Sequence, residues 1–314
     1  MKSQPKSQAD IIPKNFGARK VFAAHKNAHN EGAYMLKLDA LKFEKVWGYE
    51  LWLASTHENG VQKKFLEYAG GEYPLLVKII NAEEKLSVQV HPDDAAAAAL
   101  EGGGNVGKTE CWYVLSAKPG AKLVYGLNGA YSSEELSQAM ESGTLGNFLN
   151  EVPVKKGDFI FIPAGTVHAI GGGLRLLEVQ QSCDITYRLY DWGRPREVHT
   201  EKSLKSIKQN PLSQIAQFGK KFECEYFRME EIEISGSYSE VNSGEKNSPR
   251  DVTLFFVLEG SGRVRGGGRE NENSSEKILE CDFKAEDIFA LGGKEEITFI
   301  AENAKIIKIS GGKK

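Results

Sequence analysis

Short apolar runs, separated by glycine, asparagine and charged residues, dominate the chain from Leu38 onward. These runs are too short for most helices and are rich in β-branched and aromatic residues, a pattern typical of strands. The clearest are 74–80 (PLLVKII), 85–90 (KLSVQV), 111–115 (CWYVL), 158–163 (DFIFIP) and 174–180 (LRLLEVQ). The pattern therefore predicts a mainly β fold with few helices.

Three segments carry helix signals. The segment Pro92-Asp93-Asp94 offers a good cap before the alanine run at 95–99, and the serine at 132 precedes Glu135 in the spacing of a capping box. We expect the second of these helices to continue through residues 135–149. A third helix is expected to follow Thr200 and to end before Pro211.

An internal repeat indicates two related halves. Residues 154–170 (VKKGDFIFIPAGTVHAI) align without gaps on 283–299 (FKAEDIFALGGKEEITF), and 112–126 aligns with 254–268 in the same order. We interpret the repeat as a duplicated β-barrel. The predicted domains are an N-terminal extension (1–37), a metal-binding barrel with helical insertions (38–200), a helical linker (201–222) and a degenerate C-terminal barrel (223–314).

Composition narrows the class of protein. The length of 314 residues suits roughly two domains. Forty basic and 43 acidic residues give a net charge of −3, which argues against a nucleic-acid partner. No apolar run is long enough to span a membrane, and the four cysteines are scattered, so a cytoplasmic protein with free thiols is expected. The sequence makes no prediction of the oligomeric state.

Four polar residues form a candidate metal site. Gln89 and His91 are two apart in an alternating strand and leave the same face, Glu110 opens the next apolar strand, and His168 ends a Pro-x-Gly-x-x-His motif. Two imidazoles, one carboxylate and one amide suit Zn²⁺ or another first-row divalent ion, and we expect one ion per chain. On residue type alone, a single histidine is more often a hydrogen-bonded core or surface residue than a ligand, and Gln89 could orient a ligand instead of binding the ion.

The spacing Pro163-x-Gly165-x-x-His168 is similar to the second motif of cupin barrels, which favours a jelly-roll barrel. The first cupin motif fits less well, because a glutamine stands where a histidine is usual and the glutamate lies farther downstream. In the second repeat, Ile297 aligns with His168 and the counterpart of Glu110 falls near Thr253. The C-terminal barrel is therefore expected to bind no metal.

Longer segments resemble the type I mannose-6-phosphate isomerases, also called phosphomannose isomerases, over roughly residues 38–314. The resembling segments are 86–93 (LSVQVHPD), 107–113 (GKTECWY), 162–169 (IPAGTVHA), 178–182 (EVQQS) and 186–188 (TYR). The resemblance implies interconversion of mannose 6-phosphate and fructose 6-phosphate with a zinc ion bound by Gln89, His91, Glu110 and His168. It also implies a catalytic arginine at Arg188 and a functional acid at Glu178.

An aldose–ketose isomerase removes a proton beside a carbonyl, so negative charge develops on an enediolate. We expect Arg188 to help neutralise that charge, and Glu178 to move the proton or, alternatively, to be a supporting strand residue. Lys108 and Ser87 lie two residues before Glu110 and Gln89 and point to the same sides. Together with Arg194 they are candidate contacts for a small phosphosugar, unless they are ordinary surface residues.

Two other functions fit part of the pattern. Another metal-dependent cupin enzyme, such as an oxygenase or a different sugar isomerase, would more often use a second histidine in the first motif, in place of Gln89. A non-enzymatic sugar-binding cupin would be expected to lack ligands in both barrels. The intact ligand set of the first repeat, with Glu178 and Arg188 beside it, favours the isomerase.

Overall fold

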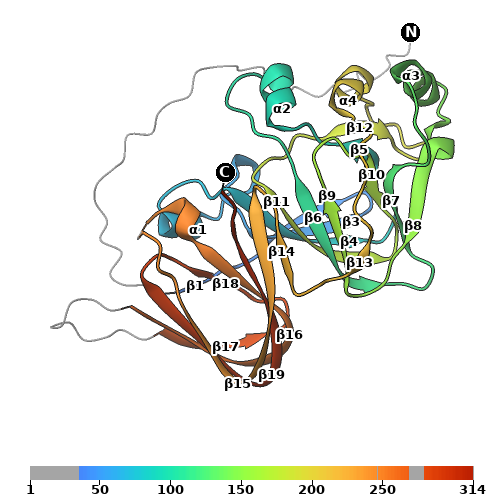
Figure 1. The fold of residues 1–314 in the computed structure, drawn as a ribbon. Helices are drawn as coiled ribbons and strands as arrows, with labels where there is room; N and C mark the ends of the chain where they lie inside the picture. Colours follow the sequence, from blue (N-terminus) through green and yellow to red (C-terminus); the bar gives the residue numbers. More distant parts are fainter. Residues whose placement is uncertain (1–34, 246, 269–278, 314) are drawn as a thin grey trace, which may run out of the picture. The chain divides into compact units, whose positions relative to one another are not determined.

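The computed structural model describes residues 35–245, 247–268 and 279–313. Most of the predicted N-terminal extension, residues 1–34, therefore lies outside the described residues. Within them, antiparallel strands form three sheets, and helices occupy the connections (Figure 1). The prediction of a mainly β fold is confirmed. Among these residues no helix has both the length and the apolar character needed to cross a membrane.

A seven-stranded sheet, here called the wide sheet, forms one wall of the candidate site. Its strand order is β13 (Ala216–Gln217), β9 (Asp158–Ile162), β6 (Glu110–Ala117), β11 (Leu174–Gln181), β4 (Leu75–Ala82), β3 (Gly48–Ala54) and β2 (Leu41–Lys45). The predicted strands at 74–80, 111–115, 158–163 and 174–180 all lie in this sheet. Its central strands β4 and β11 are almost completely buried, and β6 is buried over its first five residues.

A five-stranded sheet, the narrow sheet, forms the opposite wall. Its order is β12 (Tyr187–Tyr190), β5 (Val88–Val90), β10 (His168–Ile170), β7 (Lys122–Leu127) and β8 (Leu149–Pro153). Helices α2 (Asp94–Glu101), α3 (Ser133–Glu141) and α4 (Thr200–Ser206) lie beside it in Figure 1. Leu136 and Met140 of α3 pack in one cluster with Val88, Val124 and Tyr187, so a helix covers the outer face of this sheet.

The third sheet, the C-terminal sheet, combines three long strands with shorter ones. Its order is β1 (Leu36–Lys37), β18 (Ile288–Leu291), β16 (Thr253–Gly268), β19 (Glu295–Gly311), β15 (Phe227–Val241) and β14 (Lys221–Glu223), with β17 (Leu279–Lys284) also pairing with β16. Residues 36–37, assigned above to the N-terminal extension, thus pair with β18. The remaining helices are α1 (Lys63–Ala69) and short 3-10 turns at Glu58–Gly60, Leu145–Phe148 and Pro249–Asp251.

The two faces of the wide sheet have different roles. Because side chains alternate along a strand, Leu177 and Val179 of β11 face outward. There they join a large core with Met229, Phe256 and Ile307 of the C-terminal sheet. The intervening residues of β11, Glu178 and Gln180, are also buried but face the narrow sheet. Packing against the C-terminal sheet on one side therefore leaves polar residues on the other side for the site.

The aligned segments of the internal repeat contain the same turn. The carboxylate of Asp158 accepts the backbone N–H of Lys155 at 2.9 Å, and that of Asp287 accepts the N–H of Lys284 at 3.0 Å. The residue before each aspartate has positive φ, 86° at Gly157 and 72° at Glu286. Their N–H groups donate to equivalent neighbouring strands, to Val114 in β6 and to Val257 in β16.

The helix signals locate the helix starts better than the helix ends. Asp93 caps α2, and Ser132 and Glu135 form the capping box of α3, as expected. The expectation that this second helix continues to residue 149 is wrong. It ends at Glu141, because Gly143 takes positive φ (70°) and its N–H bonds back to Met140, which terminates the helix.

Candidate metal centre and active site

Strand pairing in the narrow sheet places three predicted site residues side by side on adjacent strands. Gln89 of β5 is paired with His168 of β10 on one side and with Arg188 of β12 on the other. Residues directly opposite each other in adjacent antiparallel strands share a face and have Cβ atoms about 5 Å apart. His91 follows Gln89 by two residues and therefore points the same way. The pairing thus collects residues that are far apart in the sequence.

The wide sheet contributes two rows of polar side chains to the same interior. Glu110 of β6 lies opposite Gln180 of β11. One step along, Trp112 of β6 lies opposite Glu178 of β11, which in turn lies opposite Lys78 of β4. Glu110, Glu178 and Lys78 expose 0%, 2% and 6% of their surface. Burying this much charge is costly, so each group needs a partner within the site.

His91, Glu110 and His168 form a compact cluster whose candidate ligand atoms all lie within 4.8 Å of one another. Nε2 of His91 lies 3.6 Å from Oε2 of Glu110, and Nε2 of His168 lies 3.4 Å from Oε1. The side-chain amide of Gln89 lies 3.3 Å from Nε2 of His168. Among the described residues this is the one group of at least three such side chains close enough to hold a metal ion.

The Nδ1 atoms of both histidines form hydrogen bonds to backbone carbonyls outside the cluster. Nδ1 of His91 bonds to the carbonyl of Ile185 at 2.9 Å, and Nδ1 of His168 bonds to the carbonyl of Thr166 at 2.8 Å. A carbonyl can only accept, so these partners assign the proton to Nδ1 and leave the Nε2 lone pair facing the cluster. Burial lowers the pKa of His91 well below its usual value and that of His168 to about 4. Both rings are therefore neutral, as metal ligands must be.

Glu110 is the negatively charged member of the cluster. No hydrogen-bond donor among the described residues satisfies its buried Oε1. Nζ of Lys108 lies 2.7 Å from Oε2 and 3.1 Å from Nε2 of His91. Burial, reinforced by the charge of Glu178, raises the pKa of Glu110. A buried carboxylate with an unsatisfied oxygen beside two neutral imidazoles is the arrangement expected of a divalent-cation site.

Glu178 is held in its charged form by neighbouring cations. Its Oε1 lies 3.3 Å from Nζ of Lys78 and 3.8 Å from Nζ of Lys108, and its Oε2 accepts the indole N–H of Trp112 at 2.9 Å. Burial alone would raise the pKa of Glu178, but the two lysines and the indole outweigh it and hold the pKa below its usual value. Glu178 is thus an ionised carboxylate in a water-poor interior.

Comparison with known proteins identifies the family. A model described as the catalytic domain of type I phosphomannose isomerase matches residues 36–105. Mannose-6-phosphate isomerase ManA of Bacillus subtilis (strain 168) is 38% identical over 234 residues, which cover 69% of this chain and 70% of that protein. The chain belongs to the mannose-6-phosphate isomerase family. A mannose-6-phosphate isomerase of Streptococcus mutans is 42% identical over 197 residues, 52% of this chain and 61% of that protein.

Solved structures of mannose 6-phosphate isomerases share the fold of this chain. The crystal structure of mannose 6-phosphate isomerase from Bacillus subtilis superposes with a TM-score of 0.72 at 26% identity, covering 88% of this chain and 99% of that one. A mannose 6-phosphate isomerase bound with zinc and yttrium has a TM-score of 0.63 at 16% identity, covering 89% and 100% of the two chains. At that identity the second likeness concerns the fold alone.

Six of the predicted mannose-6-phosphate isomerase site residues meet between the two sheets: Gln89, His91, Lys108, Glu110, His168 and Glu178. Ser87 is buried two residues before Gln89. Arg188 is half-buried; its Nη1 donates to the carbonyl of Glu197 at 2.8 Å, while its buried Nε finds no partner among the described residues. Arg194 donates to Asp191 at 2.7 Å and to the carbonyl of Lys85 at 2.6 Å.

Sequence reasoning missed Lys78 and the supporting role of His199. A lysine inside the apolar run LLVKIINA was the available signal for Lys78, because a charge is almost never buried without a partner. His199 is the residue that immediately precedes α4. Its Nδ1 accepts the backbone N–H of Arg188 at 3.0 Å, and its own N–H donates to the carbonyl of Arg188 at 2.8 Å. It therefore fixes the backbone of the predicted catalytic arginine.

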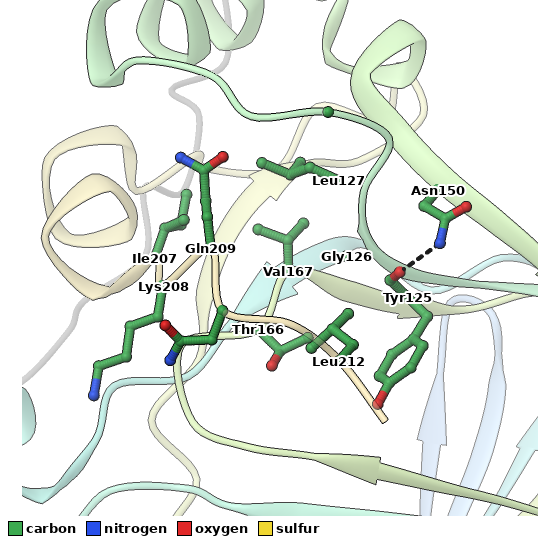
Figure 2. A pocket seen from close by; sticks show the side chains of 12 residues that line it. Tyr125, Gly126, Leu127, Asn150, Thr166, Val167, Ile207, Lys208, Gln209 and Leu212 are labelled. Atoms are coloured by element: carbon green, nitrogen blue, oxygen red, sulfur yellow. Dashed lines mark hydrogen bonds between the residues drawn. The ribbon is translucent and has the colours of Figure 1, made fainter. Parts of the chain in front are cut away.

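A separate cavity of about 260 Å³ is lined in part by Thr166 and Val167, the two residues that precede the candidate ligand His168 in the sequence (Figure 2). Its walls include Tyr125, Thr166 and Val167, together with residues 207–210 after α4. The same Thr166 accepts the Nδ1 hydrogen bond of His168 through its carbonyl. None of the predicted ligands lines this cavity, so it is distinct from the metal cluster.

Proposed function

We propose that the chain interconverts mannose 6-phosphate and fructose 6-phosphate, using one zinc ion held by Gln89, His91, Glu110 and His168. The observation that carries the proposal is the buried cluster of His91, Glu110 and His168 in a chain of the mannose-6-phosphate isomerase family. The ionised Glu178 beside the cluster supplies the second requirement, a base.

The donor set fits zinc. Neutral imidazole nitrogens, a carboxylate and an amide oxygen are ligands of divalent first-row ions, and the unsatisfied Oε1 of Glu110 is available for a cation. The amide of Gln89 would turn its oxygen toward the ion, since the assignment of amide oxygen and nitrogen is interchangeable. A bound zinc ion supplies positive charge that stabilises an oxyanion on the substrate.

In the proposed mechanism, Glu178 removes the proton beside the sugar carbonyl and returns it to the neighbouring carbon, through an enediolate. Lys78 and Lys108 favour this role because they keep the carboxylate ionised despite its burial. Negative charge then develops on O1 or O2 of the substrate. Arg188 is proposed to neutralise it, since a guanidinium donates hydrogen bonds without giving up its proton.

The phosphosugar is proposed to contact Lys108, Ser87 and Arg194. The position of Lys108, 2.7 Å from Oε2 of Glu110, favours the reacting end of the sugar over the phosphate. Arg194 is already hydrogen-bonded to Asp191 and to the carbonyl of Lys85, so a phosphate would have to share it. The near-neutral net charge of −3 suits a small anion bound by a few local cations.

We further propose that the fold is a pair of cupin-like jelly-roll barrels, with the predicted boundaries at 38–200, 201–222 and 223–314. The wide and narrow sheets would form the metal-binding barrel, and the C-terminal sheet the degenerate one. The repeated turn at Asp158 and Asp287 supports the duplication. Ile297, the counterpart of His168, is fully buried among aromatic side chains, which supports a barrel without metal. The free cysteines suit a reducing, cytoplasmic setting.

A coupled assay tests the activity. Purified full-length protein is supplied with mannose 6-phosphate, and fructose 6-phosphate formation is followed with and without a chelator, then after zinc is restored. The proposal expects turnover that the chelator abolishes and zinc recovers. The Glu110→Gln variant is the matched control, because it keeps the size of the side chain but not its charge. Turnover that is absent, or indifferent to the chelator, would overturn the proposal.

A further inference from the structure

The segment 107–109, which carries Lys108 into the site, is fixed by three backbone hydrogen bonds. The N–H of Gly107 donates to Oδ1 of Asp94 at 2.8 Å, that of Lys108 to the carbonyl of Pro92 at 3.0 Å, and that of Thr109 to Oε1 of Gln181 at 2.8 Å. None of these partners belongs to the metal cluster. The position of Lys108 and of the adjacent Glu110 thus depends on groups outside the site.

Asp94, in the first turn of α2, joins these contacts together. Besides Gly107, its Oδ1 accepts the amide of Gln181 at 3.0 Å, the residue that also binds Thr109. Its other oxygen, Oδ2, accepts the hydroxyl of Tyr226 at 3.0 Å. One carboxylate therefore connects both ends of the segment with a residue more than 100 positions away in the sequence.

Tyr226 belongs to the C-terminal sheet. It lies in the tight hairpin between β14 and β15, where the N–H of Cys224 donates to the carbonyl of Phe227 at 3.0 Å. The N–H of Gly312 also donates to the carbonyl of Tyr226 at 2.7 Å, and Phe227 is fully buried in the core shared with the wide sheet. The backbone that holds the phenol ring is therefore well anchored.

The segment has no room to move independently of α2. A side chain at position 107 would place its Cβ 2.5 Å from the backbone carbon of Asp93 and 2.6 Å from the nitrogen of Asp94. Gly107 thus rests directly on the first turn of the helix. A shift of Asp94 is passed on to Gly107 and from there to Lys108, whose Nζ makes contacts of 2.7 Å and 3.1 Å with Glu110 and His91.

From these contacts we propose that Tyr226 is a positioning residue: through Asp94, the β14–β15 hairpin of the C-terminal sheet sets the position of Lys108 and Glu110. The inference rests on the proposed function for its kinetic effect, but not for its structural one. It gives the C-terminal sheet a direct part in the site although that sheet contributes no group to the metal cluster.

The variant Tyr226→Phe removes the hydroxyl and keeps the ring. Because it removes one hydrogen bond of the network, we expect the amides of residues 107–109 to exchange with deuterium about threefold to tenfold faster. We expect kcat to fall by about the same factor, well inside the factor of roughly 100 that a misplacement on the order of 1 Å can cost. KM changes less than kcat, because the displaced groups act on the reacting atoms.

Tyr73→Phe is the matched control. The hydroxyl of Tyr73 donates to the carbonyl of Val252 at 3.3 Å, so it also connects the first half of the chain with the C-terminal half, through a residue outside the network around Asp94. This control is expected to lower stability at most, leaving kcat and the exchange of 107–109 unchanged. An equal loss of kcat in Tyr73→Phe and Tyr226→Phe would overturn the proposal, since general loosening would then explain both.

Substitutions of Asp94 test whether Tyr226 acts on residues 107–109 through this carboxylate. Asp94→Ala removes the hydrogen bonds to Gly107, Gln181 and Tyr226 together, so it is expected to lower kcat and speed the exchange more than Tyr226→Phe does. Asp94→Asn, which keeps an oxygen for Gly107, is expected to recover part of the loss. When Asp94→Ala is already present, adding Tyr226→Phe should change neither kcat nor the exchange of residues 107–109 any further. Additive effects would overturn the proposal. If the wild type does not isomerise mannose 6-phosphate, the proposed function fails, whereas the exchange of residues 107–109 still decides this inference.

Discussion

The ion pair between Lys78 and Glu178 is the part of the site that is most open to measurement, and the change that probes it is Lys78→Met. Methionine keeps the length of the side chain and removes the charge. Both partners are buried, with side-chain exposures of 7% and 3%. Removing the ammonium therefore leaves a carboxylate in a poorly solvated interior, a change that strongly destabilises proteins.

The separation of 3.3 Å between Nζ of Lys78 and Oε1 of Glu178 determines how strongly the two charges attract. With an effective dielectric constant of about 20, Coulomb's law gives an attraction of about 5 kcal/mol at this distance. Lys108 at 3.8 Å and Trp112 at 2.9 Å still stabilise Glu178 in the variant, so the cost is smaller than this. We expect the free energy of unfolding to fall by about 2 to 4 kcal/mol at neutral pH.

The stabilisation by the Lys78–Glu178 ion pair depends on pH. Because Glu178 has a lowered pKa in the folded chain, its ion pair stabilises the protein above the unfolded value of about 4.3 and is lost as the pH falls through the folded-state pKa. The difference in the free energy of unfolding between the wild type and Lys78→Met is therefore largest near neutral pH and disappears on acidification. In the active enzyme the same substitution raises the pKa of Glu178, which moves the acid limb of the kcat/KM profile to higher pH.

Urea unfolding of the metal-free protein, followed by tryptophan fluorescence at several pH values, measures the effect. Lys122→Met is the matched control, because Lys122 pairs with Glu151 at 3.5 Å on the surface, where a pair is worth about 0 to 1 kcal/mol. The double variant Lys78→Met with Glu178→Gln should cost clearly less than the sum of the single changes. If Lys78→Met costs no more than Lys122→Met at neutral pH, the reasoning about the buried pair is refuted.

Further predictions concern the metal, the arginine and the repeated turn. Glu110→Gln should weaken zinc binding on the order of 100-fold or more in a chelator competition, and unchanged affinity would exclude Glu110 as a ligand. In the wild type, zinc affinity should fall as the pH falls, first through protonation of Glu110, whose pKa is raised, while His168 resists protonation until about pH 4; a pH-independent affinity would contradict this. Arg188→Ala should lower kcat on the order of 100-fold and leave the zinc content unchanged, and full turnover would exclude the arginine from catalysis. Asp158→Ala, which frees the N–H of Lys155, should cost about 1 to 3 kcal/mol in urea unfolding with little change in kcat, and a stable variant would show that the turn does not need the carboxylate.

Alternation and turn chemistry made the main part of the site predictable. The two-residue spacing of Gln89 and His91 places both on one face, and the strand DFIFIP followed by Pro-x-Gly-x-x-His leads His168 back to that face. Both signals are local, and both depend on the period of a strand. The sequence could not reveal that His168 and Arg188 lie on opposite sides of Gln89, because strand order depends on the whole sheet.

The features that escaped prediction depend on tertiary contacts. Lys78 stands in an apolar strand, and only the pairing of β4 with β11 shows that Glu178 is its partner. The contact between Tyr226 and Asp94 joins the β14–β15 hairpin of the C-terminal sheet to the first turn of α2, and neither local sequence carries a signal for it. The helix α3 is shorter than the expected 135–149, because Gly143 takes positive φ and ends the helix after Glu141.

Isomerisation in D₂O, followed by NMR, shows whether the chain transfers a proton between the two sugar carbons and whether it needs zinc to do so. Metal-stripped and zinc-restored samples of the full chain are each incubated with mannose 6-phosphate. We expect fructose 6-phosphate to form only in the zinc-restored sample and to carry deuterium at C1, since a carboxylate that receives the proton can exchange it with solvent. Equal product formation in both samples, or none in the zinc-restored one, would contradict the account.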